Sequence, residues 1–162
     1  MKSVFWLIRD AIGGRPGPQW EPWSVTELRA AGFDAVINLS EHPSDFEAFA
    51  AAGLEASWVP LPTDIPPTNE SEERCVEALP RAYAFVAAQM AQGRRVLVHC
   101  HGGRDRTGML LAILVAKREG YAAPAAIQRV REVRPLAITA PGWEALALRV
   151  IPQVVAMLPG QT

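Results

Sequence analysis

The sequence predicts an α/β fold: a central, mainly parallel, twisted sheet of about four to five strands with helices on both of its faces. The first observation is that short apolar runs, over residues 35–39, 54–61 and 96–98, alternate with helix-like segments. The second is a length of 162 residues, which is enough for one substantial core. The third is an ordinary soluble composition, 49% hydrophobic and 20% charged. We therefore expect a single domain over residues 1–162.

Charge and cysteine content restrict the class of function. A formal net charge of −1 argues against a broad nucleic-acid or membrane-surface face, because both need a basic surface. No apolar run approaches the ~18 residues of a membrane-spanning helix, and the N-terminus lacks the pattern of a secretory signal. Two cysteines do not make a disulfide framework. We expect a monomeric, cytoplasmic protein.

The chain begins with a predicted edge strand, Val4–Ile8. A second, two-residue apolar segment, Ala11-Ile12, leads into Gly13–Pro18, whose glycines and prolines predict a turn-rich loop. This loop lacks the G-x-G-x-x-G spacing of a nucleotide-binding loop. Ser24 followed by Glu27 is the pattern of a capping box, so we expect the first helix to begin there.

A strand–helix–strand unit follows. Ala35–Leu39 is the predicted central strand, and Leu54–Leu61 is the next strand along the chain. Between them, Ser44–Ala52 is a short amphipathic helix with Phe46 and Phe49 on its apolar face. Five tryptophans are expected to pack in the core or at its rim instead of forming a ligand surface: Trp6, Trp20, Trp23, Trp58 and Trp143.

Four helices are predicted in the second half of the chain. The first begins at Asn69 or Ser71 and runs to about Ala91, with a kink or break at Pro80. The others cover Met109–Arg118, Ala123–Arg134 and Trp143–Leu158, the last interrupted at Pro152. Three arginines of the third helix, Arg129, Arg131 and Arg134, lie on more than one face, which favours a solvated surface over an anion site.

Residues 96–108 carry the chemistry. The apolar run Val96–Val98 ends in His99-Cys100, and two glycines and a basic turn then lead to Arg106, Thr107 and a helix. A tight loop between a strand and a helix N-terminus points backbone N–H groups into one concavity, where the helix dipole also favours an anion. The same groups stabilise a thiolate, so Cys100 is a predicted nucleophile and Arg106 a two-pronged phosphate ligand. The alternative, a buried cysteine beside a solvated basic turn, leaves the paired glycines unexplained.

This stretch resembles the H-C-x₅-R-[ST] signature of the cysteine-dependent protein tyrosine and dual-specificity phosphatases, through His99, Cys100, Arg106 and Thr107. The chain is similar to a small, single-domain, dual-specificity-like member, and the resemblance spans about residues 4–150. It implies the α/β phosphatase fold and hydrolysis of a phosphomonoester through a phosphocysteine, without cofactor or metal. The phosphate-binding loop would comprise His101, Gly102, Gly103, Arg104, Asp105 and Arg106.

The resemblance also implies a role for each residue. Cys100 attacks phosphorus, while Arg106 and the loop amides hold the equatorial oxygens. Thr107 donates a hydrogen bond to the sulfur, and His99 supports the loop. The general acid is Asp64, the one carboxylate in the proline-stiffened loop over residues 60–68.

Two alternatives remain open for the acid. Asp64 is also suited to a simple Asx turn before two prolines. Asp105, inside the loop, could take the acid role instead, or could order the loop by an ion pair with Arg104 or Arg106. The string Gly-Arg-Asp-Arg-Thr-Gly resembles a bacterial tyrosine phosphatase subgroup whose loop reads Lys-Asp-Arg-Thr-Gly.

The substrate is not fixed by these residues. A phosphorylated protein or peptide is the first expectation, and a phosphoinositide is the alternative, because some of that subgroup accept such lipids and Arg104 and His101 add positive charge. A non-catalytic phosphate-binding module is the second alternative. Inactive relatives usually lose the cysteine, the arginine or the acid, and all three candidates are present here.

Two further expectations concern cysteine and histidine. Cys75 could pair with the nucleophile in a disulfide, but a buried helix cysteine is the favoured interpretation. The three histidines, His42, His99 and His101, do not have the spacing of a zinc site, so we expect no metal.

Overall fold

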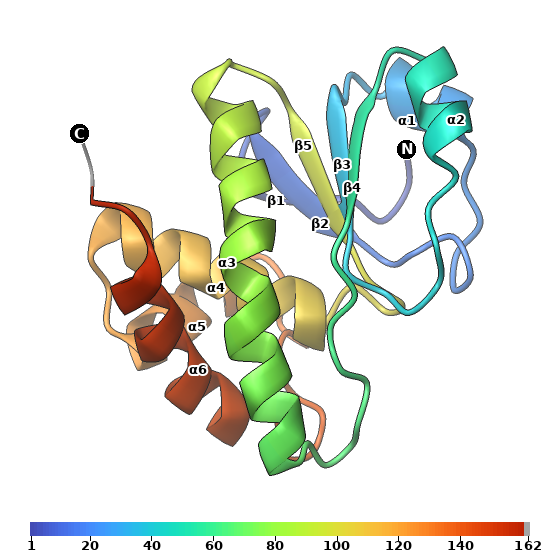
Figure 1. Cartoon of the computed structure of the whole chain (residues 1–162). Helices are drawn as coiled ribbons and strands as arrows, with labels where there is room; N and C mark the ends of the chain where they lie inside the picture. Colours follow the sequence, from blue (N-terminus) through green and yellow to red (C-terminus); the bar gives the residue numbers. More distant parts are fainter. Residues whose placement is uncertain (161–162) are drawn as a thin grey trace.

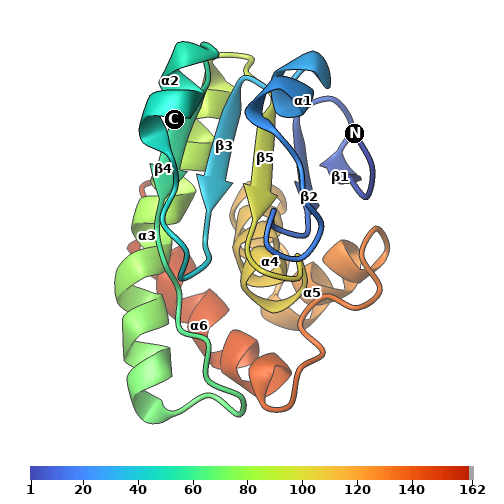
Figure 2. The same cartoon turned by 90° about the vertical axis from the view of Figure 1, so that its right-hand side faces the viewer.

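The computed structural model describes residues 1–160 and confirms the predicted fold class. One sheet contains five strands in the order β1-β2-β5-β3-β4. The strands are β1 (Phe5–Ile8), β2 (Ile12–Arg15), β3 (Ala35–Asn38), β4 (Glu55–Trp58) and β5 (Val96–His99). Only the β1–β2 pair is antiparallel, and the other three pairs are parallel. Their carboxyl ends therefore meet at one edge, where α4 begins (Figure 2).

Helices cover both faces of the sheet (Figure 1). Successive strand residues point to opposite faces, so Val36 and Leu97 pack beneath one pair of helices while Ile37 and Val98 pack beneath the other group. The pair is α1 (Val25–Ala30) and α2 (Phe46–Ala51). The group is α3 (Asn69–Ala91), α4 (Asp105–Glu119), α5 (Ala123–Arg131) and α6 (Trp143–Met157).

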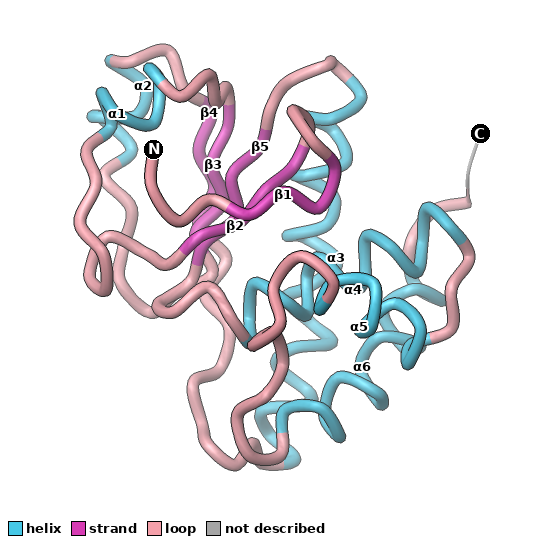
Figure 3. The backbone as a smooth tube through the Cα atoms, turned by 180° about the vertical axis from the view of Figure 1, so that it is seen from behind, coloured by secondary structure: helices cyan, strands magenta, loops and turns pink. Residues whose placement is uncertain are grey.

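Helix α4 lies at the centre of the larger core. Its residues from Thr107 to Ala116 are all buried, which requires apolar residues around the whole helix. Helices α3, α5 and α6 pack around it in the lower half of the molecule (Figure 3). The buried body of α4 therefore fixes where the loop after β5 enters the helix.

The starts of α1 and α3 follow local capping chemistry. Ser24 caps α1 as predicted, with its Oγ accepting from the N–H of Glu27 at 3.1 Å. The Glu27 carboxylate accepts from the Ser24 hydroxyl, at 3.4 Å, and not from the Ser24 backbone N–H, so only half of the expected capping box forms. A complete box forms at α3, between Thr68 and Ser71.

The predicted turn over Gly13–Pro18 is wrong for its first half. Gly13, Gly14 and Arg15 belong to β2, which lies between β1 and β5 and is buried. A Cβ at Gly14 would come within 2.4 Å of the Phe5 ring, so the glycine is needed for the side chain of β1 to lie across β2. Val4–Ile8 is an edge strand, as predicted.

Neither a break at Pro80 nor an interruption at Pro152 occurs, because buried neighbours such as Leu79 and Ile151 hold the helices against the core despite the lost hydrogen bond. On α2 only Phe49 is buried, and Phe46 is 48% exposed. Phe46 is the first residue of this six-residue helix, one turn before Phe49, and its ring remains at the surface.

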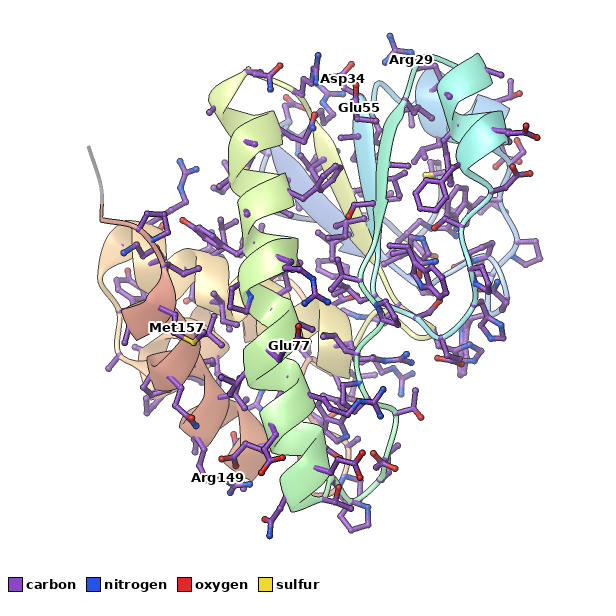
Figure 4. All side chains as sticks on the ribbon, viewed as in Figure 1. Arg29, Asp34, Glu55, Glu77, Arg149 and Met157 are labelled. Carbon is purple, nitrogen blue, oxygen red and sulfur yellow. The ribbon has the colours of Figure 1, made fainter. Side chains whose placement is uncertain are left out.

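Asp34 joins the amino-terminal ends of β3 and β5, at the edge opposite the start of α4 (Figure 4). Its Oδ2 accepts from the backbone N–H of Arg95 at 2.9 Å, and its Oδ1 accepts from Arg29 at 2.8 Å. The pKa of Asp34 lies below its ordinary value, mainly because its carboxylate accepts the hydrogen bond from the Arg95 backbone. Burial alone would raise this pKa, and the hydrogen bond and charge of Arg29 lower it further.

We predict that Asp34→Asn lowers the free energy of unfolding by roughly 1 kcal/mol at neutral pH, since the site is half-exposed and partly screened. A depressed folded-state pKa contributes stability above the ordinary carboxyl pKa, and that stability is lost as pH falls through the folded value. The difference from wild type should therefore shrink in acid. Urea unfolding at several pH values measures it, with exposed Glu55→Gln as the control, and a difference independent of pH would contradict the assignment.

Candidate active site

Three buried polar side chains mark the carboxyl-terminal edge of the sheet. Arg15 ends β2, His99 ends β5 and Asn38 ends β3, and the three strands are parallel neighbours in register. In open α/β sheets this edge is where ligands bind. The loop that carries Cys100 leaves the sheet here, between its two central neighbours.

Two glycines fix the shape of that loop against the segment after β2. Gly103 has φ +66°, and a Cβ there would lie 2.6 Å from the carbonyl carbon of Arg15. Gly17 donates its N–H to the His101 carbonyl at 2.8 Å, and a Cβ at Gly17 would lie 2.1 Å from the Cys100 carbonyl oxygen. The loop therefore packs backbone to backbone, with no room for a side chain.

The loop leaves its own amides available. Within residues 1–160, no protein acceptor pairs with the backbone N–H groups of residues 101–106. They lie at the start of the buried helix α4, which begins at Asp105. Unpaired amides at a helix N-terminus bind anions. They border a pocket of about 280 Å³ lined by Trp20, Ile65, Cys100, His101, Gly102, Arg104, Asp105, Arg106 and Ala140.

Cys100 lies in this pocket with two polar neighbours. The Thr107 hydroxyl donates to its Sγ at 3.1 Å, and Thr107 is fully buried. His99 Nδ1 lies 3.2 Å from the Cys100 carbonyl, which can only accept, so Nδ1 carries the proton. Burial lowers the pKa of His99 to about 4, with nearby Arg15 and Arg106 acting in the same direction against the bond to Cys100. The imidazole is neutral at neutral pH and anchors the loop backbone.

Two arginines hold the loop from opposite sides. Arg106 donates to Oε2 of Glu41 at 2.7 Å. Partial burial alone would raise the pKa of Glu41, but the hydrogen bond and charge of Arg106 outweigh it, so this pKa lies below its usual value. Arg134 donates to the carbonyls of Gly102 and Gly103, at 2.9 and 3.1 Å.

The expectation of a solvated basic surface is therefore wrong for the arginines after α4. Arg134 holds the loop, Arg131 donates to the carbonyls of Ala137 and Ile138, and Arg129 donates to the carbonyl of Leu7. Each guanidinium donates to carbonyls of a loop, a turn or the edge strand β1 instead of remaining in solvent. Sequence spacing on one helix does not reveal such partners.

The two candidate acids occupy different environments. Asp105 lines the pocket, and its Oδ1 accepts from the Ala140 N–H at 3.1 Å, with no ion pair to an arginine among the described residues. Asp64 does not line the pocket. Its Oδ2 accepts from the Ser71 hydroxyl at 2.8 Å, its carbonyl accepts from the Trp143 indole at 3.1 Å, and its neighbour Ile65 faces the pocket instead.

Several residues at the site escaped sequence reasoning. Glu41 follows the carboxyl end of β3, the strand beside β5. That position in the sequence was the one indication that Glu41 would lie near Cys100. Trp20 is 57% exposed, lies edge-on to His101 and has Arg104 over its ring at 5.7 Å, although it was expected to serve packing alone. Ile65 and Ala140 carry no chemical signal at all.

The histidine and cysteine expectations have separate outcomes. Spacing argued against a ligand cluster, yet the fold brings ligand atoms of Glu41, His42 and His101 within 4.8 Å of one another. Cys75 is fully buried and, like Cys100, is not in a disulfide. Burial raises the pKa of Cys75 to about 12, which makes it a poor redox partner at neutral pH.

A family model decides the relationship. The model described as "Dual specificity phosphatase, catalytic domain" matches residues 20–146, most of the chain and the whole of the loop. The chain belongs to this dual-specificity phosphatase family.

Named relatives agree with this assignment. Dual specificity protein phosphatase 12 of Rattus norvegicus is 30% identical over 117 residues, which are 72% of this chain and 33% of the rat protein. Phosphatidylglycerophosphate phosphatase PTPMT1 of Arabidopsis thaliana is 25% identical over 126 residues, 77% of this chain and 36% of the plant protein. The chain thus spans about a third of the length of these curated relatives.

Solved structures share the fold. Tk-PTP in its active form superposes with a TM-score of 0.74 at 23% identity, covering 97% of this chain and 99% of that one. Human DUSP28 gives 0.70 at 20% identity, covering 94% and 95%. Both cover nearly the whole of this chain.

We predict that Arg134→Met weakens the binding of tungstate, a phosphate mimic, by about tenfold, because two carbonyl hydrogen bonds that shape the loop are lost. Isothermal titration calorimetry measures the affinity. Arg129→Met is the matched control, since it removes an arginine of α5 that also donates to a backbone carbonyl, that of Leu7, but does not contact the loop. Equal losses in both variants would show that the effect is one of general stability.

Proposed function

We propose that the protein is a phosphomonoester hydrolase that acts through a phosphocysteine, with phosphorylated protein or peptide as substrate. The observation that carries the proposal is the Thr107 hydroxyl donating to Cys100 Sγ in a pocket bordered by unpaired amides. A hydrogen bond to sulfur stabilises the thiolate form, as attack and departure both require. Membership in the phosphatase family supports it.

The proposed reaction has two steps. The Cys100 thiolate attacks phosphorus and forms an S–P bond, while the bond from phosphorus to the substrate oxygen breaks and that oxygen takes a proton from the general acid. Water then attacks phosphorus in the phosphocysteine and gives a proton to the same carboxylate. The S–P bond breaks, which regenerates the Cys100 thiolate and releases inorganic phosphate. The loop amides and Arg106 stabilise the equatorial oxygens in both steps.

Glu41 supports this role for Arg106. A guanidinium has more donors than one carboxylate oxygen can accept, so the bond to Glu41 orients the group and leaves other N–H donors for phosphate. Only 12% of the Arg106 side chain is exposed, which limits the other orientations that the guanidinium can take. We assign Glu41 as a positioning residue.

We assign the general acid to Asp64 and a loop-ordering role to Asp105. The Asp105 carboxylate is engaged by the Ala140 N–H, which ties α4 to the segment before α6. Asp64 is exposed and precedes Ile65, which faces the pocket, so rotation away from Ser71 would carry its carboxylate toward the leaving oxygen.

Phosphoinositide is the second candidate substrate, favoured by Arg104 and His101 at the rim of the pocket. PTPMT1 shares the fold, with a TM-score of 0.71 at 17% identity, and its structure is a complex with PI(5)P. A human tyrosine phosphatase-like serine/threonine/tyrosine-interacting protein shares it as well, with 0.73 at 15% identity. The fold is therefore compatible with a phosphoinositide phosphatase and with a protein-interaction module. The presence of both Cys100 and Arg106 favours an enzyme.

We further propose a single catalytic domain that acts as a cytoplasmic monomer. Within residues 1–160, no helix is long and apolar enough to cross a membrane. A nucleophilic thiol and a buried, unpaired Cys75 suit a reducing compartment.

We predict that Cys100→Ser lowers turnover of p-nitrophenyl phosphate by roughly 10³-fold or more and still binds tungstate, because the cradle is mainly backbone. Cys75→Ala is the matched control and should keep its activity, since that thiol is buried in α3. Wild-type turnover in the Cys100 variant would rule out the mechanism. Comparing phosphotyrosine and phosphoserine peptides, phosphoinositides and RNA 5′-phosphates then defines the substrate.

We predict that Asp64→Asn lowers kcat by roughly 10²-fold for an alkyl phosphate and much less for a leaving group that needs no proton. The basic limb of the pH profile should flatten at the same time. Asp105→Asn should alter KM or stability, because it loses the Ala140 contact. If Asp105→Asn instead shows the dependence on leaving group, the two roles are reversed.

A further inference from the structure

We propose that Glu41, His42 and His101 form a binding site for Zn²⁺ at the rim of the pocket, and that the bound ion reversibly inhibits the enzyme. The three residues come from two loops, one after β3 and one after β5, which the parallel sheet brings to the same edge. The inhibitory part rests on the proposed phosphatase function, whereas the binding part does not.

The donor atoms already lie close together. All three ligand atoms fall within 4.8 Å of one another, and His42 Nε2 is 3.2 Å from Glu41 Oε1. Tetrahedral zinc with bonds of about 2.0–2.1 Å places its ligands roughly 3.3 Å apart, so small side-chain rotations suffice. His101 Nδ1 is buried and has no hydrogen-bond partner among the described residues, so the ring breaks no hydrogen bond at this nitrogen when it turns toward an ion.

The loop carrying Glu41 and His42 is held in place by a buried amide. Asn38 donates to the His42 carbonyl at 2.7 Å and accepts from both the N–H and the hydroxyl of Ser40, at 2.8 and 2.7 Å. The Ser40 hydroxyl oxygen in turn accepts from the His42 N–H at 3.2 Å. Metal sites need ligands whose backbone is already positioned.

His101 is restrained from the other side. Gly17 donates to its carbonyl, and Trp20 lies edge-on to its ring with centroids 5.4 Å apart. The His42 and His101 rings have centroids 6.4 Å apart. The two imidazoles therefore lie next to each other beside Glu41, with their ligand atoms within 4.8 Å of one another and of the carboxylate.

The charge balance allows a divalent ion here. Glu41 uses Oε2 for Arg106 and Oε1 for His42, so a metal can replace the His42 contact while the bond to Arg106 remains. Arg106 opposes a cation at this distance, which favours a metal that gains covalent character from nitrogen ligands over Mg²⁺ or Ca²⁺. Two imidazoles and one carboxylate are a donor set that zinc uses, with a fourth position left open.

Occupancy would affect the pocket directly. His101 is the residue after Cys100 and lines the pocket, so an ion on its ring occupies the rim through which phosphate enters. The same ion draws on the carboxylate that orients Arg106. We expect inhibition that appears mainly as a raised apparent KM and is reversed by a chelator, unlike oxidation of the thiol.

Binding is tested without reference to activity. Calorimetric titration of Zn²⁺ into Cys100→Ser should give one site, because the thiolate is absent and the three ligands remain. Adding His42→Ala should weaken that site by at least about tenfold, since loss of a ligand costs no less than loss of its supporting partner. If Cys100→Ser does not bind Zn²⁺, or if His42→Ala leaves its affinity unchanged, the site is overturned, whatever the outcome for phosphatase activity.

Inhibition is tested on the active chain. His42→Ala should keep the metal-free rate toward p-nitrophenyl phosphate and raise the Zn²⁺ concentration for half inhibition at least about tenfold. Glu55→Gln, which removes an exposed carboxylate at the opposite edge of the sheet, should not alter it. Equal sensitivity of His42→Ala and wild type would show that zinc acts at Cys100 itself and would overturn the inhibitory role.

Discussion

The structure depends on one close approach, the packing of the loop after β5 against the segment after β2. Gly17 touches the Cys100 carbonyl and Gly103 touches the Arg15 carbonyl, and at both points a Cβ would overlap backbone atoms. In this packing the loop carbonyls accept hydrogen bonds from Gly17 and Arg134, while the loop amides have no acceptor within residues 1–160. An anion pocket made of backbone is thus a consequence of strand order, which places β2 and β5 side by side.

Sequence reasoning succeeded where the signal is local and contiguous. The run through His99, Cys100 and Arg106 lies at a strand-to-helix junction, as its pattern predicts, and most helices and strands were placed by periodicity and caps. It failed where a residue's state depends on a distant partner. Gly13 and Gly14 look like a turn until the side chain of Phe5 is known to lie across them. Glu41, Trp20 and Arg134 are assembled by the fold, and no spacing relates them to Cys100. The prolines inside α3 and α6 show packing overriding a local rule.

The arginines around the pocket show why charge alone does not identify a phosphate ligand. Arg15 is buried with Trp23 near its guanidinium, at 5.7 Å, and pairs with Glu21 at 3.4 Å. Arg134 is committed to loop carbonyls, and Arg106 is bonded to Glu41. A carboxylate beside an anion site is unfavourable by Coulomb's law, but Glu41 is half-exposed, so water screens its repulsion of phosphate. Its bond to Arg106 is screened less, because it is short and charge-assisted and only 12% of the Arg106 side chain is exposed.

Selectivity must then come from the rim and not from the cradle. In the proposed reaction, the backbone amides and Arg106 would bind three phosphate oxygens, which every phosphomonoester presents alike. The groups that differ between substrates meet Trp20, Ile65 and the Arg104 guanidinium instead. Trp20 and Ile65 offer an apolar wall suited to a flat ring, whereas Arg104 and His101 offer charge suited to a second phosphate. The two surfaces are coupled, since Arg104 lies over the Trp20 ring. A substrate whose second phosphate binds Arg104 would draw the guanidinium away from the indole. A substrate whose ring stacks on the indole would displace Arg104. One rim can therefore serve an aromatic or a polyanionic substrate, but it cannot make both sets of contacts fully at once.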